Sequence, residues 1–251
     1  GCQNHIISNM KTERHNIAGR MIIKALSKSP WGAGLINTDV GKDERLAQHN
    51  LQLPAHASNR TIPDFLFSRN IPHRSRLNTS RPDAILVTPY HAKPNSSSSS
   101  SSSSTLPSSS SSSRYMLRSR HRNMQRTSMA SRVRQPHHLN PNQRHVHLIE
   151  IKYCEDTRPE HQLAAAQIQH AHLCKLIHAK TVTIHPILLG VGGTCYKEHT
   201  LNQFKKLGLD HQRATKLARS LHAHSAIYAH KLVTTRRAIE NNVTSHSQVL
   251  G

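Results

Sequence analysis

The sequence predicts an α/β fold, in which short apolar strands and amphipathic helices share one core. Three runs with strand length and β-branched residues occur at residues 84–87, 145–154 and 181–189. Segments with the 3–4 residue spacing of helices lie before, between and after them. Only 35% of the 251 residues are hydrophobic, so we expect a single core of about 150–180 residues.

The first elements are predicted from spacing and helix breakers. A helix of about three turns should start at Glu13, whose carboxylate suits the positive end of a helix dipole, and end before Pro30 and Gly32. Residues 34–40 are then expected to form a strand, and residues 44–51 a short helix.

The later helices carry start signals. The run Asp156-Thr157-Arg158-Pro159-Glu160 combines a capping residue, an early proline and a first-turn acid, and predicts a helix to about residue 178. Thr200-Leu201-Asn202-Gln203 is typical of a capping box at the start of a short helix. Asp210 is expected to cap a long helix that reaches about Ile239.

Low complexity interrupts the chain between two of the strands. Serine homopolymers at residues 96–104 and 108–113 bury no apolar surface and should be disordered. Seven arginines and no acid follow between Arg114 and Arg134, which predicts either a flexible phosphate-binding arm or a solvated loop that grew by repeat slippage. We therefore expect one discontinuous domain at residues 1–95 and 135–240, an insertion at residues 96–134, and a disordered tail at residues 241–251.

Charge points to a polyanionic partner. The chain has 34 Lys+Arg against 13 Asp+Glu, a net charge of +21, which favours nucleic acid first and an anionic membrane second. No apolar run approaches the ~18 residues of a membrane span. Four cysteines without CxxC spacing indicate reduced thiols in an intracellular protein. Because the chain begins at Gly1 without an initiator Met, it is expected to be a piece of a longer product.

The acids are few, so their positions are informative. Glu150 lies inside the apolar run of residues 145–154, where an ionised carboxylate needs compensation, and it shares a strand face with Lys152. Asp83 follows a proline and opens the apolar run Ala84 to Val87. Two acids on neighbouring strands supply the oxygen ligands that Mg²⁺ prefers. Asp64, in a second Pro-Asp pair, is the alternative to Asp83.

The Pro-Asp and Glu-x-Lys pattern resembles the PD-(D/E)xK nuclease superfamily. The order of motifs is most similar to the restriction-like endonuclease domain of early-branching, site-specific non-LTR retrotransposon proteins, such as those of green algae. This resemblance covers about residues 11–240 and rests on five segments: Arg14-His15-Asn16, Arg81-Pro82-Asp83, Leu148-Ile149-Glu150-Ile151-Lys152, Leu188 to Gly193 and Lys206 to Leu209.

The resemblance implies a restriction-endonuclease-like core, with a small central mixed sheet flanked by helices, and nicking of target DNA to prime reverse transcription. Asp83 and Glu150 would bind Mg²⁺ or Mn²⁺, and Lys152 would position or activate the attacking water. Four accessory residues are Glu13, Asp64, Gln167 and Gln169. Six expected nucleic-acid ligands are Arg114, Arg118, Arg120, Arg122, Arg236 and Arg237.

The expected partner is DNA, together with RNA if the chain belongs to a larger reverse-transcriptase polyprotein, in the nucleus and without a membrane or a small-molecule cofactor. Two other functions stay open: a catalytically decayed nucleic-acid-binding remnant, which the serine expansion favours, and a host repair or restriction-type nuclease. The 22 histidines show no zinc-site spacing, and most are expected at polar surface positions.

Overall fold

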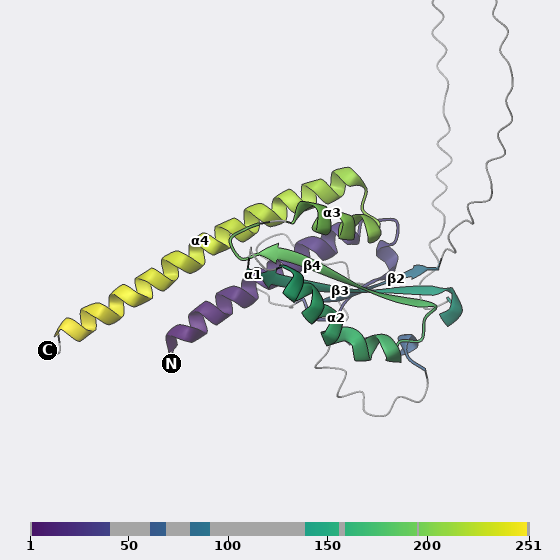
Figure 1. Ribbon diagram of the computed structural model, residues 1–251, viewed down its shortest axis with the longest axis horizontal. Coiled ribbons are helices and arrows are strands. Elements are labelled where there is room, and N and C mark those ends of the chain that lie inside the picture. The colour runs from purple at the N-terminus through teal and green to yellow at the C-terminus, as the bar shows by residue number, and fades with distance from the viewer. Residues whose placement is uncertain are drawn as a thin grey trace, which may run out of the picture. The chain divides into compact units, whose positions relative to one another are not determined.

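The computed structural model describes residues 2–40, 61–68, 81–90, 139–155, 159–194 and 196–249 (Figure 1). Its centre is a four-stranded sheet in the order β1-β2-β3-β4. The strands are β1 (Leu35–Asn37), β2 (Ala84–Pro89), β3 (Arg144–Cys154) and β4 (Thr181–Gly190). Strand β2 is antiparallel to its neighbours β1 and β3, and β4 runs parallel to β3, so the predicted α/β class with a mixed sheet is confirmed.

Helices cover both faces of this sheet (Figure 1). They are α1 (Cys2–Leu26), α2 (Pro159–Leu176), α3 (Lys197–Lys206) and α4 (His211–Val249). Side chains alternate along β3, so Ile149 and Ile151 pack with α1, α3 and α4, whereas Val146 and Leu148 pack with α2. Three short 3₁₀ helices, η1 (Gly32–Gly34), η4 (Asp64–Leu66) and η7 (Pro141–Gln143), complete the described elements.

Several predicted boundaries differ from the structure. Helix α1 begins at Cys2, so Glu13 lies mid-helix and is not the first-turn acid that was expected. Strand β1 is shorter than the predicted residues 34–40 at both ends. Gly34 belongs to η1, and after Asn37 the chain bends, with the Asn37 side chain bonded to the backbone N–H and C=O of Val40. Helix α3 begins before Thr200, whose hydroxyl donates to the Leu188 carbonyl (3.2 Å), so the predicted capping box is wrong.

The C-terminal helix also differs. Asp210 does cap α4, because its Oδ1 accepts the Arg213 backbone N–H at 2.8 Å. The helix continues to Val249, past the expected end at Ile239, so most of the predicted disordered tail at residues 241–251 is helical. The physical reason is that no proline or glycine occurs between residues 211 and 250.

Contacts group residues 1–90 with residues 134–251 into one compact unit. The predicted helix at residues 44–51 and the insertion at residues 96–134 lie outside the described residues. Within the described ranges, no helix combines the length and apolar character needed to cross a bilayer.

Candidate active site

Glu150 is a buried carboxylate on the face of β3 that α2 covers. Its side chain is only 5% exposed. Its Oε1 lies 2.6 Å from Nζ of Lys152, and its Oε2 accepts a hydrogen bond from Nε2 of His170 at 2.8 Å. Burial by itself raises the pKa of Glu150, but the hydrogen bonds from His170 and Lys152 outweigh burial and lower that pKa. Glu150 is therefore ionised at neutral pH.

Helix α2 supplies one partner of this carboxylate, His170, and a second acceptor for Lys152, Gln169. His170 is fully buried on its inner stripe beside Ala166 and Leu173. One residue earlier, Oε1 of Gln169 accepts a hydrogen bond from Nζ of Lys152 at 2.8 Å. The Lys152 ammonium is therefore fixed between two acceptors at the edge of the site.

Asp83 lies next to Glu150 across the β2–β3 pair. Ala84 pairs with Ile149 in antiparallel register, which places Asp83 one step further along, opposite Glu150. Oδ2 of Asp83 accepts the backbone N–H of Ile151 at 2.6 Å. Burial raises the pKa of Asp83, with the nearby Glu150 charge adding to the rise, while His15 and the Ile151 N–H oppose it.

His15 of α1 reaches the same point. Its Nε2 lies 3.4 Å from Oδ1 of Asp83 and 3.2 Å from the Ile151 carbonyl oxygen. Burial lowers the pKa of His15, but the hydrogen bond and charge of Asp83 outweigh burial and raise that pKa to about 9. His15 is therefore a charged imidazolium at neutral pH, and its Nε2 lies next to both the Asp83 carboxylate and the Ile151 carbonyl oxygen.

The oxygen atoms at this site are of the kind that binds a hard cation such as Mg²⁺. Two carboxylates and a backbone carbonyl are oxygen ligands, which Mg²⁺ and Mn²⁺ prefer. Among the described residues, no group of three or more histidine, cysteine or acidic side chains is arranged to hold a metal. The residues therefore fit Mg²⁺ in chemistry, on condition that the His15 imidazole leaves the Asp83 oxygen.

The other predicted accessory acids lie elsewhere. Glu13 forms a hydrogen bond with Tyr228 of α4, because a position two residues from His15 points to the other side of a helix. Asp64 is exposed at the start of η4. The Phe65 carbonyl beside it accepts from Arg144, which precedes Glu150 by six strand residues, about 20 Å. Asp64 therefore lies towards the opposite end of the sheet.

The remaining predicted site residues lie either on the surface or outside the described residues. Gln167 is exposed on α2, whereas Gln169 accepts the bond from Lys152. Arg236 and Arg237 line a cleft between α1 and α4. Four arginines of the basic arm lie outside the described residues: Arg114, Arg118, Arg120 and Arg122.

Two residues of the site were not assigned from the sequence, His15 and His170. His15 is the middle residue of the Arg14-His15-Asn16 motif, which entered the family resemblance without a role. His170 occupies the apolar stripe of its helix. The sequence did contain a signal for His170: a histidine on the apolar stripe of a helix needs a polar partner, and the preceding strand contains Glu150.

A second polar cluster lies on the opposite face of the sheet. Thr88 Oγ1, His147, His185 and Gln203 Oε1 form a chain of hydrogen bonds of 3.2, 2.9 and 2.7 Å. Burial, with the neighbouring histidines, lowers the pKa of His147 to about 3, and burial lowers that of His185 to about 4. His147, His170 and His185 are all buried, so they are exceptions to the expectation that most histidines lie on the surface.

Comparison with known proteins gives no match: no family model, no curated protein and no solved structure is significantly similar to this chain.

Proposed function

We propose that this protein is a metal-dependent DNA endonuclease with a PD-(D/E)xK-type, restriction-endonuclease-like core, of the kind that nicks target DNA for retrotransposition. One observation carries the proposal. Asp83 and Glu150 are both buried beside Ile151: Asp83 holds the Ile151 amide at 2.6 Å, and Glu150 holds Lys152 at 2.6 Å. Acid, acid and amine thus meet at one end of a core strand pair.

The chain's own groups have distinct roles in this proposal. Asp83, Glu150 and the Ile151 carbonyl would hold Mg²⁺ or Mn²⁺, which when bound supplies Lewis-acid polarisation of the scissile phosphate and acidifies a bound water. Lys152, fixed by Gln169, orients the attacking water and offsets charge that develops on the phosphoryl oxygens. His170 keeps Glu150 ionised and correctly oriented.

DNA as the substrate follows from the charge balance. A net charge of +21 favours binding of a phosphate backbone through counterion release. The site supplies water activation beside this backbone, which is what phosphodiester hydrolysis requires.

The test compares three substitutions that each remove one negative charge. Asp83→Asn and Glu150→Gln should lower Mg²⁺- or Mn²⁺-dependent nicking of supercoiled plasmid by at least about 100-fold, because each removes a cation ligand. Asp64→Asn is the matched control, since Asp64 is exposed and distant from Glu150, and it should nick like the unmodified protein. Thermal unfolding of each variant separates loss of chemistry from loss of fold. Unchanged nicking by Asp83→Asn or Glu150→Gln would refute the proposal.

A noncatalytic nucleic-acid-binding protein is the second candidate, and one observation favours it. Both carboxylates already have cationic or hydrogen-bonding partners: His15 at Asp83, and His170 and Lys152 at Glu150. If these partners are permanent, the site is structural. Binding of duplex DNA without metal-dependent nicking by the unmodified protein would support this alternative.

A further inference from the structure

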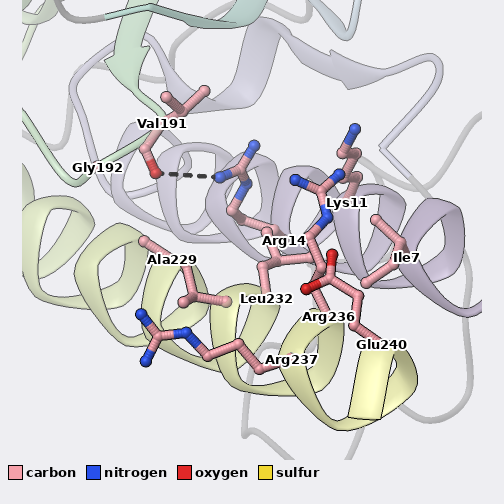
Figure 2. A pocket seen from close by; sticks show the side chains of 11 residues that line it. Ile7, Lys11, Arg14, Val191, Gly192, Ala229, Leu232, Arg236, Arg237 and Glu240 are labelled. Carbon is pink, nitrogen blue, oxygen red and sulfur yellow. Dashed lines mark hydrogen bonds between the residues drawn. The ribbon is translucent and has the colours of Figure 1, made fainter. Parts of the chain in front are cut away.

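A basic cleft lies between α1 and α4 (Figure 2). Asp83 and Glu150 of the candidate active site are not among the residues that line it. Its volume is about 570 Å³. Four cationic side chains and one acidic side chain line it, namely Lys11, Arg14, Arg236, Arg237 and Glu240. In Figure 2 the Arg14 guanidinium points toward the Val191 carbonyl, and the Arg236 side chain extends from α4 toward α1. The rest of the wall includes apolar residues such as Ile7 and Leu232.

Arg14 is the unusual member of this group, because it is buried. It is 5% exposed, donates from one terminal nitrogen to the Val191 carbonyl at 3.3 Å, and stacks on the Tyr153 ring at 3.8 Å. Its Nε is buried and has no hydrogen-bond partner in the described structure. Among the described residues no carboxylate forms an ion pair with it.

A buried guanidinium without a counterion is costly, because arginine remains charged in proteins and its desolvation is not offset. A carbonyl and an aromatic face offset only part of that cost. A bound anion in the cleft would supply the missing charge. The neighbouring Lys11 and Arg236 have exposed side chains, so an anion from solution can reach them.

The cleft adjoins the candidate active site through the chain itself. Arg14 directly precedes His15, which contacts Asp83, and Tyr153 directly follows Lys152 in β3. Glu150 and Tyr153 lie on opposite faces of β3, so the Glu150 carboxylate and the Arg14 guanidinium that stacks on Tyr153 lie on opposite faces of the same end of this strand. A polymer with regularly spaced phosphates can contact both.

We propose that the α1–α4 cleft binds a backbone phosphate of duplex DNA that flanks the phosphate at Glu150. This inference rests on the proposed function for its choice of ligand. In it, Arg14 is the buried anchor, and Lys11 and Arg236 are the outer contacts. The cleft positions the duplex and takes no part in bond cleavage.

The experiment measures duplex binding without cleavage, by fluorescence anisotropy of a labelled duplex in EDTA across a series of salt concentrations. The variant is Lys11→Gln/Arg236→Gln, chosen because both side chains are exposed and the fold should persist. The control is Lys28→Gln/Arg219→Gln, which removes the same charge from two exposed positions outside this cleft, Lys28 just after α1 and Arg219 on α4. We expect the cleft variant to bind about tenfold more weakly, with the salt slope reduced by about 2, and the control to bind within about twofold of the unmodified protein.

The other outcomes are decisive. Equal weakening by the cleft and control variants would mean only diffuse charge attraction and would overturn the inference. A cleft that instead holds a free anion would show thermal stabilisation by inorganic phosphate that the cleft variant loses, with duplex binding unchanged, and this also overturns it.

The nicking assay separates this inference from the proposed function. If the cleft variant binds DNA more weakly and the unmodified protein does not nick DNA, the cleft is a DNA-binding site and the proposed nuclease function is wrong. If the unmodified protein nicks DNA and the cleft variant binds DNA as well as the unmodified protein does, the nuclease function stands and the proposed role of the cleft is wrong.

Discussion

Glu150 lies in an apolar strand at a tolerable cost because two side chains offset its charge. Lys152 comes from the same strand face, two residues on, and His170 comes from the helix packed over that face. The sequence shows the first partner directly, since side chains two apart on a strand share a face. The second partner depends on how α2 docks.

Removal of His170 should therefore destabilise the fold. His170→Leu leaves one oxygen of a buried carboxylate without its donor, and we expect the free energy of unfolding to fall by about 1–3 kcal/mol. His172→Leu, at an exposed position on the same helix, is the matched control and should change stability by less than about 0.5 kcal/mol. Urea unfolding at pH 7 measures both; equal effects would show that the His170–Glu150 bond contributes no stability.

The buried His147–His185 pair predicts acid lability. In the neutral pair each imidazole accepts through Nε2 and donates through Nδ1, along the chain from Thr88 to Gln203. Their folded-state pKa values of about 3 and about 4 lie below the ordinary histidine pKa of about 6.5. The unfolded chain therefore binds protons first as the pH falls, and stability present above pH 6.5 is lost below it.

We expect these two residues together to lower the free energy of unfolding by up to about 2.7 kcal/mol per pH unit between about pH 6 and pH 4. His185→Asn should reduce that slope by about half, whereas His172→Asn should leave it unchanged. Urea unfolding at several pH values measures the slope. A slope that His185→Asn does not alter would place the acid sensitivity in other groups.

At the scale of elements, the close approach of η1 to β2 sets the position of the sheet edge. A Cβ added to Gly34 would lie 2.0 Å from the Val87 carbonyl oxygen, a backbone atom that cannot move aside without loss of strand pairing. The chain must therefore have glycine where it turns into β1. This requirement also explains why β1 starts at Leu35 and not at Gly34.

Gly34→Ala should consequently lower the free energy of unfolding by about 3 kcal/mol or more, through displacement of the β1 edge. Gly192→Ala is a suitable control, because Gly192 is exposed in the turn after β4 and its backbone is outside the positive-φ region. Thermal unfolding compares the two. A Gly34→Ala protein as stable as the control would mean that the β1 edge shifts freely.

At the scale of the whole molecule, we expect strands β2 and β3 to pair without help from the insertion at residues 96–134. The β2–β3 pair is held to its end by the backbone bond from Tyr90 N–H to the Gln143 carbonyl, at 2.7 Å. A loop between antiparallel neighbours contributes only a logarithmic entropy term. We therefore expect that the fold does not depend on the insertion at residues 96–134.

Replacement of residues 96–134 by a short Gly-Ser linker should change the free energy of unfolding by only about 1 kcal/mol. The same replacement distinguishes the two interpretations of the seven arginines. If they form a phosphate-binding arm, the salt slope of duplex binding decreases by several units; if they belong to a solvated loop, the slope stays the same. Thermal unfolding and salt-dependent anisotropy measure the two effects, and loss of the fold would contradict the separability of the insertion.

The sequence by itself determined the class of fold, the strands β2, β3 and β4, the cap of α4 by Asp210, and the pairing of Glu150 with Lys152. These depend on local rules, namely alternation along a strand, capping and apolar periodicity, which act over a few residues. Its errors at α1, α3 and the end of α4 are boundary errors, where several continuations have similar local energies.

Only the tertiary structure decided which distant groups meet. The contacts of His15 with Asp83 and of His170 with Glu150, like the burial of Arg14 beside Tyr153, join segments far apart in the chain. Nothing in local spacing encodes them, because they depend on the docking of α1 and α2 against opposite faces of one sheet. The physical reason is that burial raises the energy of each lone charge, and only the packed arrangement places a compensating group within bonding distance.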